Sequence, residues 1–234
     1  MAPEPHPHQP PDPAPRLDAT VMAMVVAREF FDGAVVNLGI GIPMHCADVI
    51  PPDREVLLHS EHGLLGFGPI ARSPEGVDPY VFVVGNRPVH PRPGMVFLSH
   101  DESFAIIRGG HIDITVLGGM QVDAAGNLAN AHAPGKPAAN LGGAPDLATG
   151  AKRTIVMMYH TASDGSAKLV ERCTLPLTAP ACVDRIVTDV AVIDVTPDGL
   201  LLREHAPGWS ADDIRAITDA PLQAADDLRE ISLG

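Results

Sequence analysis

The chain of 234 residues is 45% hydrophobic and 19% charged, so it can fold as one large domain with a substantial core. Its net charge of −13 argues against nucleic acid and anionic membranes as general partners. No apolar run approaches the ~20 residues that a membrane helix needs. The three cysteines, Cys46, Cys173 and Cys182, form no CxxC pair, which indicates reduced thiols and a cytoplasmic protein.

Helix and strand patterns alternate in the first part of the chain. Residues 1–16 are rich in proline, and we expect them to form a disordered tail before the domain begins at residue 17. The predicted elements are then a helix over 18–31, a strand over 34–38, a helix over 43–50 and a strand that runs into Glu61. This order, with a glycine-rich turn after the first strand, is typical of a parallel α/β sheet.

Shorter elements follow up to residue 221, where we expect the domain (17–221) to end and a C-terminal tail (222–234) to begin. One further helix is expected over 104–108 with Ser103 as its cap, and another begins at Ser210. The turn over 123–127 is expected to close a hairpin. The remaining predicted strands cover 80–84, 95–98, 111–117, 154–159, 168–171, 185–188, 190–194 and 200–204.

Glu61 is the strongest candidate for a catalytic side chain. It follows the apolar run of a predicted strand and precedes a glycine-rich turn, which places its carboxylate at the carboxyl end of that strand. Ligands bind at that end of the strands in open α/β sheets. A Glu there can act as a nucleophile, a general base or a metal ligand. An ordinary strand-to-turn junction accounts for the same residues, and this stretch alone does not decide between the two.

A GxG pattern over 39–41 follows the first predicted strand. Met44 stands where a dinucleotide-binding fingerprint has its third glycine, so the pattern does not favour a nicotinamide cofactor. The glycines still allow a ligand to approach the backbone closely. Asn37, at the end of the strand, could donate its side-chain amide to an oxyanion.

Histidines near Glu61 raise the question of a metal site. On a strand, His59 and Glu61 share a face while His62 points away, and no second pair of ligands lies nearby in the sequence. We therefore predict no metal. Most other histidines, including His160, are expected at the surface or in loops.

Glycines are dense over 134–144. Such a segment can form a nest of backbone amides that binds an anion or an oxyanion. A flexible loop has the same composition, and by itself the segment favours the loop.

Several motifs occur together in one order along residues 17–221. They are 37–43 (NLGIGIP), 60–69 (SEHGLLGFGP), 101–110 (DESFAIIRGG), 111–122 (HIDITVLGGMQV), 127–130 with 134–136, 142–147 (GGAPDL), 171–178 (ERCTLPLT) and 182–188 (CVDRIVT). Together they resemble the β subunit of the 3-oxoacid CoA-transferases, the succinyl-CoA:3-ketoacid type of family I. The resemblance implies a three-layer α/β fold of the CoA-transferase/NagB-RpiA-like kind, with an open, mainly parallel sheet and an antiparallel extension near the C-terminus.

The resemblance also implies a chemistry for Glu61, which matches the nucleophile of the family's Ser-Glu-Asn-Gly motif. In such enzymes the carboxylate attacks an acyl-CoA thioester, and CoA passes through a glutamyl-CoA thioester to an acceptor acid. Oxyanion donors are then expected from the Asn37 side chain and the Gly143 backbone amide. Contacts to substrate and CoA are expected from Gly39, Gly41, His62, Gly63, Gly142 and Lys136.

The sequence departs from the family pattern in places that leave the acyl substrate open. His62 replaces an Asn beside the nucleophile, and residues 131–133 replace bulkier ones. An acyl-CoA thioesterase, in which water resolves the intermediate, and a non-catalytic acyl-CoA-binding subunit therefore stay open as alternatives. CoA and acyl-CoA are expected as substrates, with no permanently bound cofactor. The family's α half is absent from this sequence, so the resemblance implies an α-subunit partner in an αβ or α2β2 assembly.

Overall fold

A computed structural model describes residues 11–71, 73, 77–78, 80–131 and 141–233. Its centre is a run of five neighbouring parallel strands, each short and largely apolar. In spatial order they are β12 (Arg185–Val187), β10 (Thr154–Met157), β7 (Ile114–Leu117), β1 (Val35–Leu38) and β2 (Leu57–Ser60). This parallel centre confirms the predicted α/β class.

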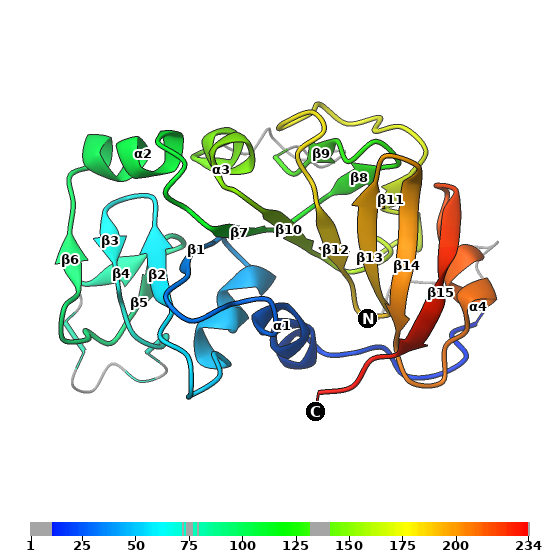
Figure 1. The fold of residues 1–234 in the computed structure, drawn as a ribbon, viewed down its shortest axis with the longest axis horizontal. Coiled ribbons are helices and arrows are strands. Elements are labelled where there is room, and N and C mark those ends of the chain that lie inside the picture. Colours follow the sequence, from blue (N-terminus) through cyan, green and yellow to red (C-terminus); the bar gives the residue numbers. More distant parts are fainter. Residues whose placement is uncertain (1–10, 72, 74–76, 79, 132–140, 234) are drawn as a thin grey trace.

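Further strands extend the sheet on both sides of this centre. Beyond β12 lie antiparallel β13 (Ala191–Thr196) and β14 (Gly199–His205), and then β15 (Leu222–Glu230), which runs parallel to β14. Beyond β2 lie antiparallel β3 (Leu64–Leu65) and β6 (Val96–Phe97). The order is β15-β14-β13-β12-β10-β7-β1-β2-β3-β6 (Figure 1). The antiparallel extension near the C-terminus is confirmed, and a second one lies at the opposite edge.

Helices cover both faces of the sheet and create the three layers seen in Figure 1. On one face lie α1 (Ala19–Ala27) and the 3-10 helix η1 (Ile42–Asp48), and on the other lie α2 (His100–Arg108) and α3 (Ala144–Gly150). The short helix α4 (Ala211–Arg215) lies beside β15. Two small sheets complete the fold: β4 (Phe82–Val83) with β5 (Arg87–Pro88), and β8 (Gln121–Asp123) between β9 (Leu128–Ala129) and β11 (Leu169–Val170).

Capping residues explain where the helices begin. Asp18 accepts hydrogen bonds from the backbone N–H groups of the first turn of α1, as its place in the sequence indicates. The predicted start of α2 is wrong, because Ser99 and Glu102 form a capping box there. Ser103 therefore lies inside the helix, where its side chain is fully buried. Helix α3 was not predicted, since its sequence is rich in glycine, alanine and proline.

The structure revises both predicted chain ends. Residues 1–10 of the expected tail lie outside the described residues, but Arg16 is anchored on the domain. Its guanidinium donates to the Asp189 carboxylate over 3.3 Å and lies 5.4 Å from the ring centre of Trp209. The predicted C-terminal tail is wrong over most of its length, because β15 pairs with the edge of β14 and Ile231 is buried behind it. Backbone pairing along an open sheet edge orders this segment despite its polar sequence.

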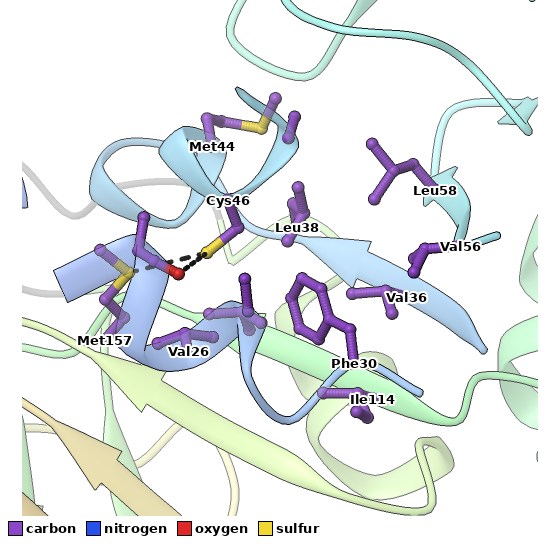
Figure 2. Close-up of a cluster of buried hydrophobic side chains, with 14 of the residues drawn as sticks. Val26, Phe30, Val36, Leu38, Met44, Cys46, Val56, Leu58, Ile114 and Met157 are labelled. Atoms are coloured by element: carbon purple, nitrogen blue, oxygen red, sulfur yellow. Dashed lines mark hydrogen bonds between the residues drawn. The ribbon is translucent and has the colours of Figure 1, made fainter. Parts of the chain in front are cut away.

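Two clusters of apolar side chains hold the layers together, one on each face of the sheet. Figure 2 shows the first, in which Phe30 and Val26 from the α1 region pack on Val36, Leu38 and other side chains of the central strands. Burial of each such side chain contributes roughly 1.5–3 kcal/mol. Because side chains alternate along a strand, the residues between these face the opposite side, toward α2 and α3.

All three cysteines are free thiols, as predicted. None of the helices in the described ranges is long and apolar enough to cross a membrane.

Candidate active site

A cavity of about 470 Å³ opens at the carboxyl ends of the central strands β1, β7 and β10. Its wall is mainly apolar, with Leu117, Leu147, Met157 and Met158 among the lining side chains. Backbone of the glycine-rich turns after β1 and β7 and of the segment before α3 completes the wall. Of the described lining residues, only three carry polar side chains, and these are Glu61, Asn130 and Lys168.

Glu61 reaches this cavity from the end of β2. Its Oε2 atom is buried and has no hydrogen-bond partner among the described residues. Buried polar atoms are almost always paired, so an unpaired carboxylate oxygen in a cavity wall marks a place where a ligand fits. Gly143 lies directly against it, since a Cβ on Gly143 would come within 3.2 Å of both Glu61 Cγ and Phe104 Cζ. Glycine at 143 therefore lets the backbone before α3 approach the carboxylate closely.

The two residues after Glu61 shape the turn and do not line the cavity. His62 Nε2 donates to the carbonyl oxygen of Phe82 over 2.8 Å, and its Nδ1 lies 2.9 Å from Ser60 Oγ. The His62 ring packs on the Phe82 ring at 5.5 Å. Gly63 has φ +121°, and a Cβ there would lie 2.2 Å from the carbonyl oxygen of Leu98. These contacts hold the turn against β4 and β6 and so fix the direction in which Glu61 points.

A row of buried polar side chains, which we call the polar ladder, lies beneath Glu61 on the face toward α2. Asn37 of β1 is in register with His59 of β2 and with Thr115 of β7. Asn37 Nδ2 lies 3.1 Å from His59 Nδ1, and Thr115 Oγ1 lies 3.4 Å from Asn37 Oδ1. His59 Nε2 then reaches Ser103 Oγ of α2 at 3.0 Å. All four side chains are fully buried, so the ladder satisfies polar groups that would otherwise be costly.

Burial determines the protonation state of His59. Burial, and to a smaller extent the electrostatic effect of nearby His62, lowers the pKa of His59 to about 4, so the His59 ring is neutral at pH 7. An amide nitrogen can only donate, so we assign Nδ1 as the acceptor from Asn37 and Nε2–H as the donor to Ser103. Asn37 Nδ2 also lies 3.3 Å from the His59 carbonyl oxygen. The amide is thus directed at His59, and Asn37 is not part of the cavity wall.

The structure brings together only some of the residues that the sequence singles out. Those that line the cavity are Glu61, Gly39, Gly41, Gly142 and Gly143. Asn37, His62 and Gly63 lie behind or beside this wall, and Lys136 falls outside the described residues. No group of three His, Cys, Asp or Glu side chains within the described ranges could hold a metal ion.

Sequence reasoning missed Lys168 and the roles of His59 and Ser103. Lys168 precedes a strand of two residues, and nothing in its local pattern connects it with Glu61, more than a hundred positions earlier. The ladder could be recognised only from the strand register. His160, expected at the surface or in a loop, is fully buried between Thr188 and Thr218.

Comparisons with known proteins agree on one family. The sequence pattern of the coenzyme A transferase family matches residues 20–216. The chain is 42% identical over 213 residues to the β subunit of the acetate CoA-transferase of Haemophilus influenzae, covering 91% of this chain and 95% of that protein. It is 46% identical over 209 residues to the corresponding subunit of the 3-oxoadipate CoA-transferase of Pseudomonas putida, covering 88% of this chain and 97% of that protein.

A solved structure of an acyl-CoA transferase from Escherichia coli, in a thioester complex with CoA, superposes with a TM-score of 0.71 at 23% identity. The superposition covers 94% of this chain and 44% of that longer chain, so it shows a shared fold over less than half of that protein. The family pattern spans most of the sequence, and two relatives align with this chain over nearly their whole length. The chain therefore belongs to the coenzyme A transferase family.

Proposed function

We propose that this chain is the β subunit of a CoA-transferase that moves CoA from an acyl-CoA to a short carboxylic acid, with Glu61 as covalent nucleophile. The observation that carries the proposal is the carboxylate of Glu61, which enters an apolar cavity with one buried oxygen unpaired among the described residues. Family membership supports transfer of CoA over hydrolysis or simple binding. The names of the relatives, which include an acetate and a 3-oxoadipate CoA-transferase, support short or 3-oxo acids as the substrate class.

The proposed reaction has two half-reactions through Glu61. A carboxylate oxygen attacks the thioester carbonyl carbon, the C–S bond breaks, and an acyl-glutamyl anhydride and CoA thiolate form. The thiolate attacks the glutamyl carbonyl carbon, releases the donor acid as its carboxylate and leaves a glutamyl-CoA thioester. The acceptor carboxylate then repeats these steps in reverse, which regenerates Glu61 and yields the new acyl-CoA.

A carboxylate nucleophile suits this exchange, because it has the same functional group as the acids that gain and lose CoA. Each half-reaction then exchanges one CoA thioester for another and is nearly thermoneutral. A serine ester would be too stable to pass CoA back. The close approach of Gly143 supports its backbone N–H as an oxyanion donor. Asn37 is the second predicted donor, and its amide would have to turn from His59 to act.

An α-subunit partner is part of the proposal. Both relatives are named as single subunits of a CoA-transferase, which supports a two-subunit enzyme in an αβ or α2β2 assembly. The reduced cysteines support a cytoplasmic location.

The decisive experiment traps the intermediate. The chain is purified with its α partner, incubated with acyl-CoA and treated with hydroxylamine, and the peptide that contains Glu61 is analysed by mass spectrometry. We expect a hydroxamate on Glu61 that requires acyl-CoA. Glu61→Gln should carry no adduct and lose CoA transfer at least ~10³-fold, since it removes the nucleophile.

Glu55→Gln is the matched control, because Glu55 is exposed just before β2 and lies far from its carboxyl end. It should keep both the adduct and the activity. Turnover of acyl-CoA without any acceptor acid would instead indicate a thioesterase. Acyl-CoA binding with no adduct, unchanged in Glu61→Gln, would indicate a binding subunit and overturn the proposal.

A further inference from the structure

Lys168 is the one cationic side chain among the described residues that line the cavity. It lies just before β11, and its backbone is held between two neighbours: its carbonyl accepts from Val122 N–H over 3.0 Å and its N–H lies 3.4 Å from the His160 carbonyl oxygen. Two of the described lining side chains, Glu61 and Lys168, therefore carry charges of opposite sign, and the rest of the described wall is mainly apolar.

The described part of the chain compensates the ammonium charge of Lys168 poorly. It makes no hydrogen bond or ion pair with any residue in the described ranges. The nearby carboxylate of Asp189 already binds Arg16 and the backbone N–H of His160. Burial lowers the pKa of Lys168 to about 8, against the opposing effect of Asp189. An ammonium that has lost its hydrating water in an apolar cavity is stabilised by any ligand oxygen that accepts a hydrogen bond from it.

We propose that Lys168 is a specificity-determining residue that binds a second oxygen acceptor of the acid substrate, a 3-oxo group or a second carboxylate. The inference rests on the proposed function, in which the reacting carboxyl group of the acid lies at Glu61. The remainder of the acid then lies in the same cavity, among Leu117, Leu147, Met157 and Met158. A plain aliphatic acid offers the ammonium no acceptor, and a site built around a polar group discriminates against ligands that lack its partner.

Three four-carbon acids test the role of Lys168 in the complex with the α subunit. Butyrate, acetoacetate and succinate have the same chain length, and only the last two carry a second acceptor. We expect wild-type kcat/KM to favour acetoacetate or succinate over butyrate, and the preferred acid identifies which acceptor Lys168 binds. Lys168→Met should reduce that preference at least tenfold, and Lys168→Arg should retain most of it. An unchanged preference in Lys168→Met would overturn the inference.

Lys152→Met is the matched control, because Lys152 is an exposed lysine that pairs with Asp113 outside the cavity. Its acid preference should equal that of the wild type. If Lys168→Met proves unstable, the wild-type preference and the binding experiment below still test the inference.

A binding experiment separates this inference from the proposed function. In Glu61→Gln, which we expect not to turn over, lysines are acetylated with and without each acid, and modification of Lys168 is measured by mass spectrometry relative to Lys152. We expect acetoacetate or succinate, but not butyrate, to protect Lys168. Protection without CoA transfer by the wild type would overturn the proposed function alone. Transfer without selective protection would overturn the role of Lys168 alone.

Discussion

Two buried histidines stand out at the scale of single residues, because their rings form hydrogen bonds only with uncharged groups among the described residues. His59 is part of the polar ladder, and His160 lies between the hydroxyl groups of Thr188 and Thr218 at 3.0 and 2.9 Å. Burial lowers the pKa of His160 to about 3, and the positive charges of Arg16 and Lys168 act in the same direction. Both rings are therefore neutral in the folded protein at every pH above about 5, whereas both ionise near pH 6.5 in the unfolded chain.

We predict that this difference destabilises the fold in mild acid. The folded pKa values lie below the unfolded value, so stability is lost as the pH falls from 6.5 toward 4, and each histidine removes about 2 kcal/mol at pH 5. Urea unfolding at pH 7 and pH 5 measures the loss. His160→Gln should roughly halve it, since Gln can still donate to Thr218 but does not ionise. An equal loss in the variant would show that other groups control the acid response.

At the scale of elements, either the local sequence or long-range backbone pairing can determine where a strand forms. The central strands are short apolar runs, and their positions were predicted because burial on both faces leaves a clear sequence signal. The sequence of β15, LQAADDLRE, has no such signal: two aspartates interrupt it, and most of its side chains are partly or fully exposed. It is a strand because its backbone pairs with β14, and such long-range pairing leaves no trace in a local window.

The residues that follow β15 allow a test of whether the C-terminal segment is an ordered part of the fold. Ile231 is 7% exposed and packs on the first apolar cluster, while Leu233, two residues later, is 49% exposed. We predict that Ile231→Ala lowers the free energy of unfolding by about 2–4 kcal/mol, because it leaves a cavity behind the last strand. Leu233→Ala should change it by less than about 0.5 kcal/mol, as for an ordinary surface substitution. Similar small effects in both variants would mean that the C-terminal segment is a tail after all.

At the scale of the whole molecule, the site depends on how distant segments meet. The position of Glu61 at the carboxyl end of a strand was predicted from its own motif, because a carboxylate after a buried strand has a recognisable local pattern. The polar ladder was not, since it exists only when β1, β2 and β7 lie in one register. The position of Lys168 likewise depends on β11, which belongs to a different sheet from β2. Sequence reasoning thus found the proposed nucleophile, Glu61, but not the polar ladder beneath it or Lys168 in the same cavity.

The rim of the cavity is the surface that we expect the α subunit to cover. Ile40, Met120 and Leu141 line the cavity and are 65%, 41% and 46% exposed, so they form an apolar rim beside Glu61. We predict that Ile40→Arg abolishes coelution with the α subunit in gel filtration, because a buried unpaired charge is costly, while the melting temperature of the isolated chain stays unchanged. Phe31→Arg is the control: Phe31 is 53% exposed but precedes β1, at the opposite end of that strand from the cavity, and coelution should persist. Full assembly of Ile40→Arg would show that the partner leaves this rim open to solvent, and the cavity would then be complete within this chain.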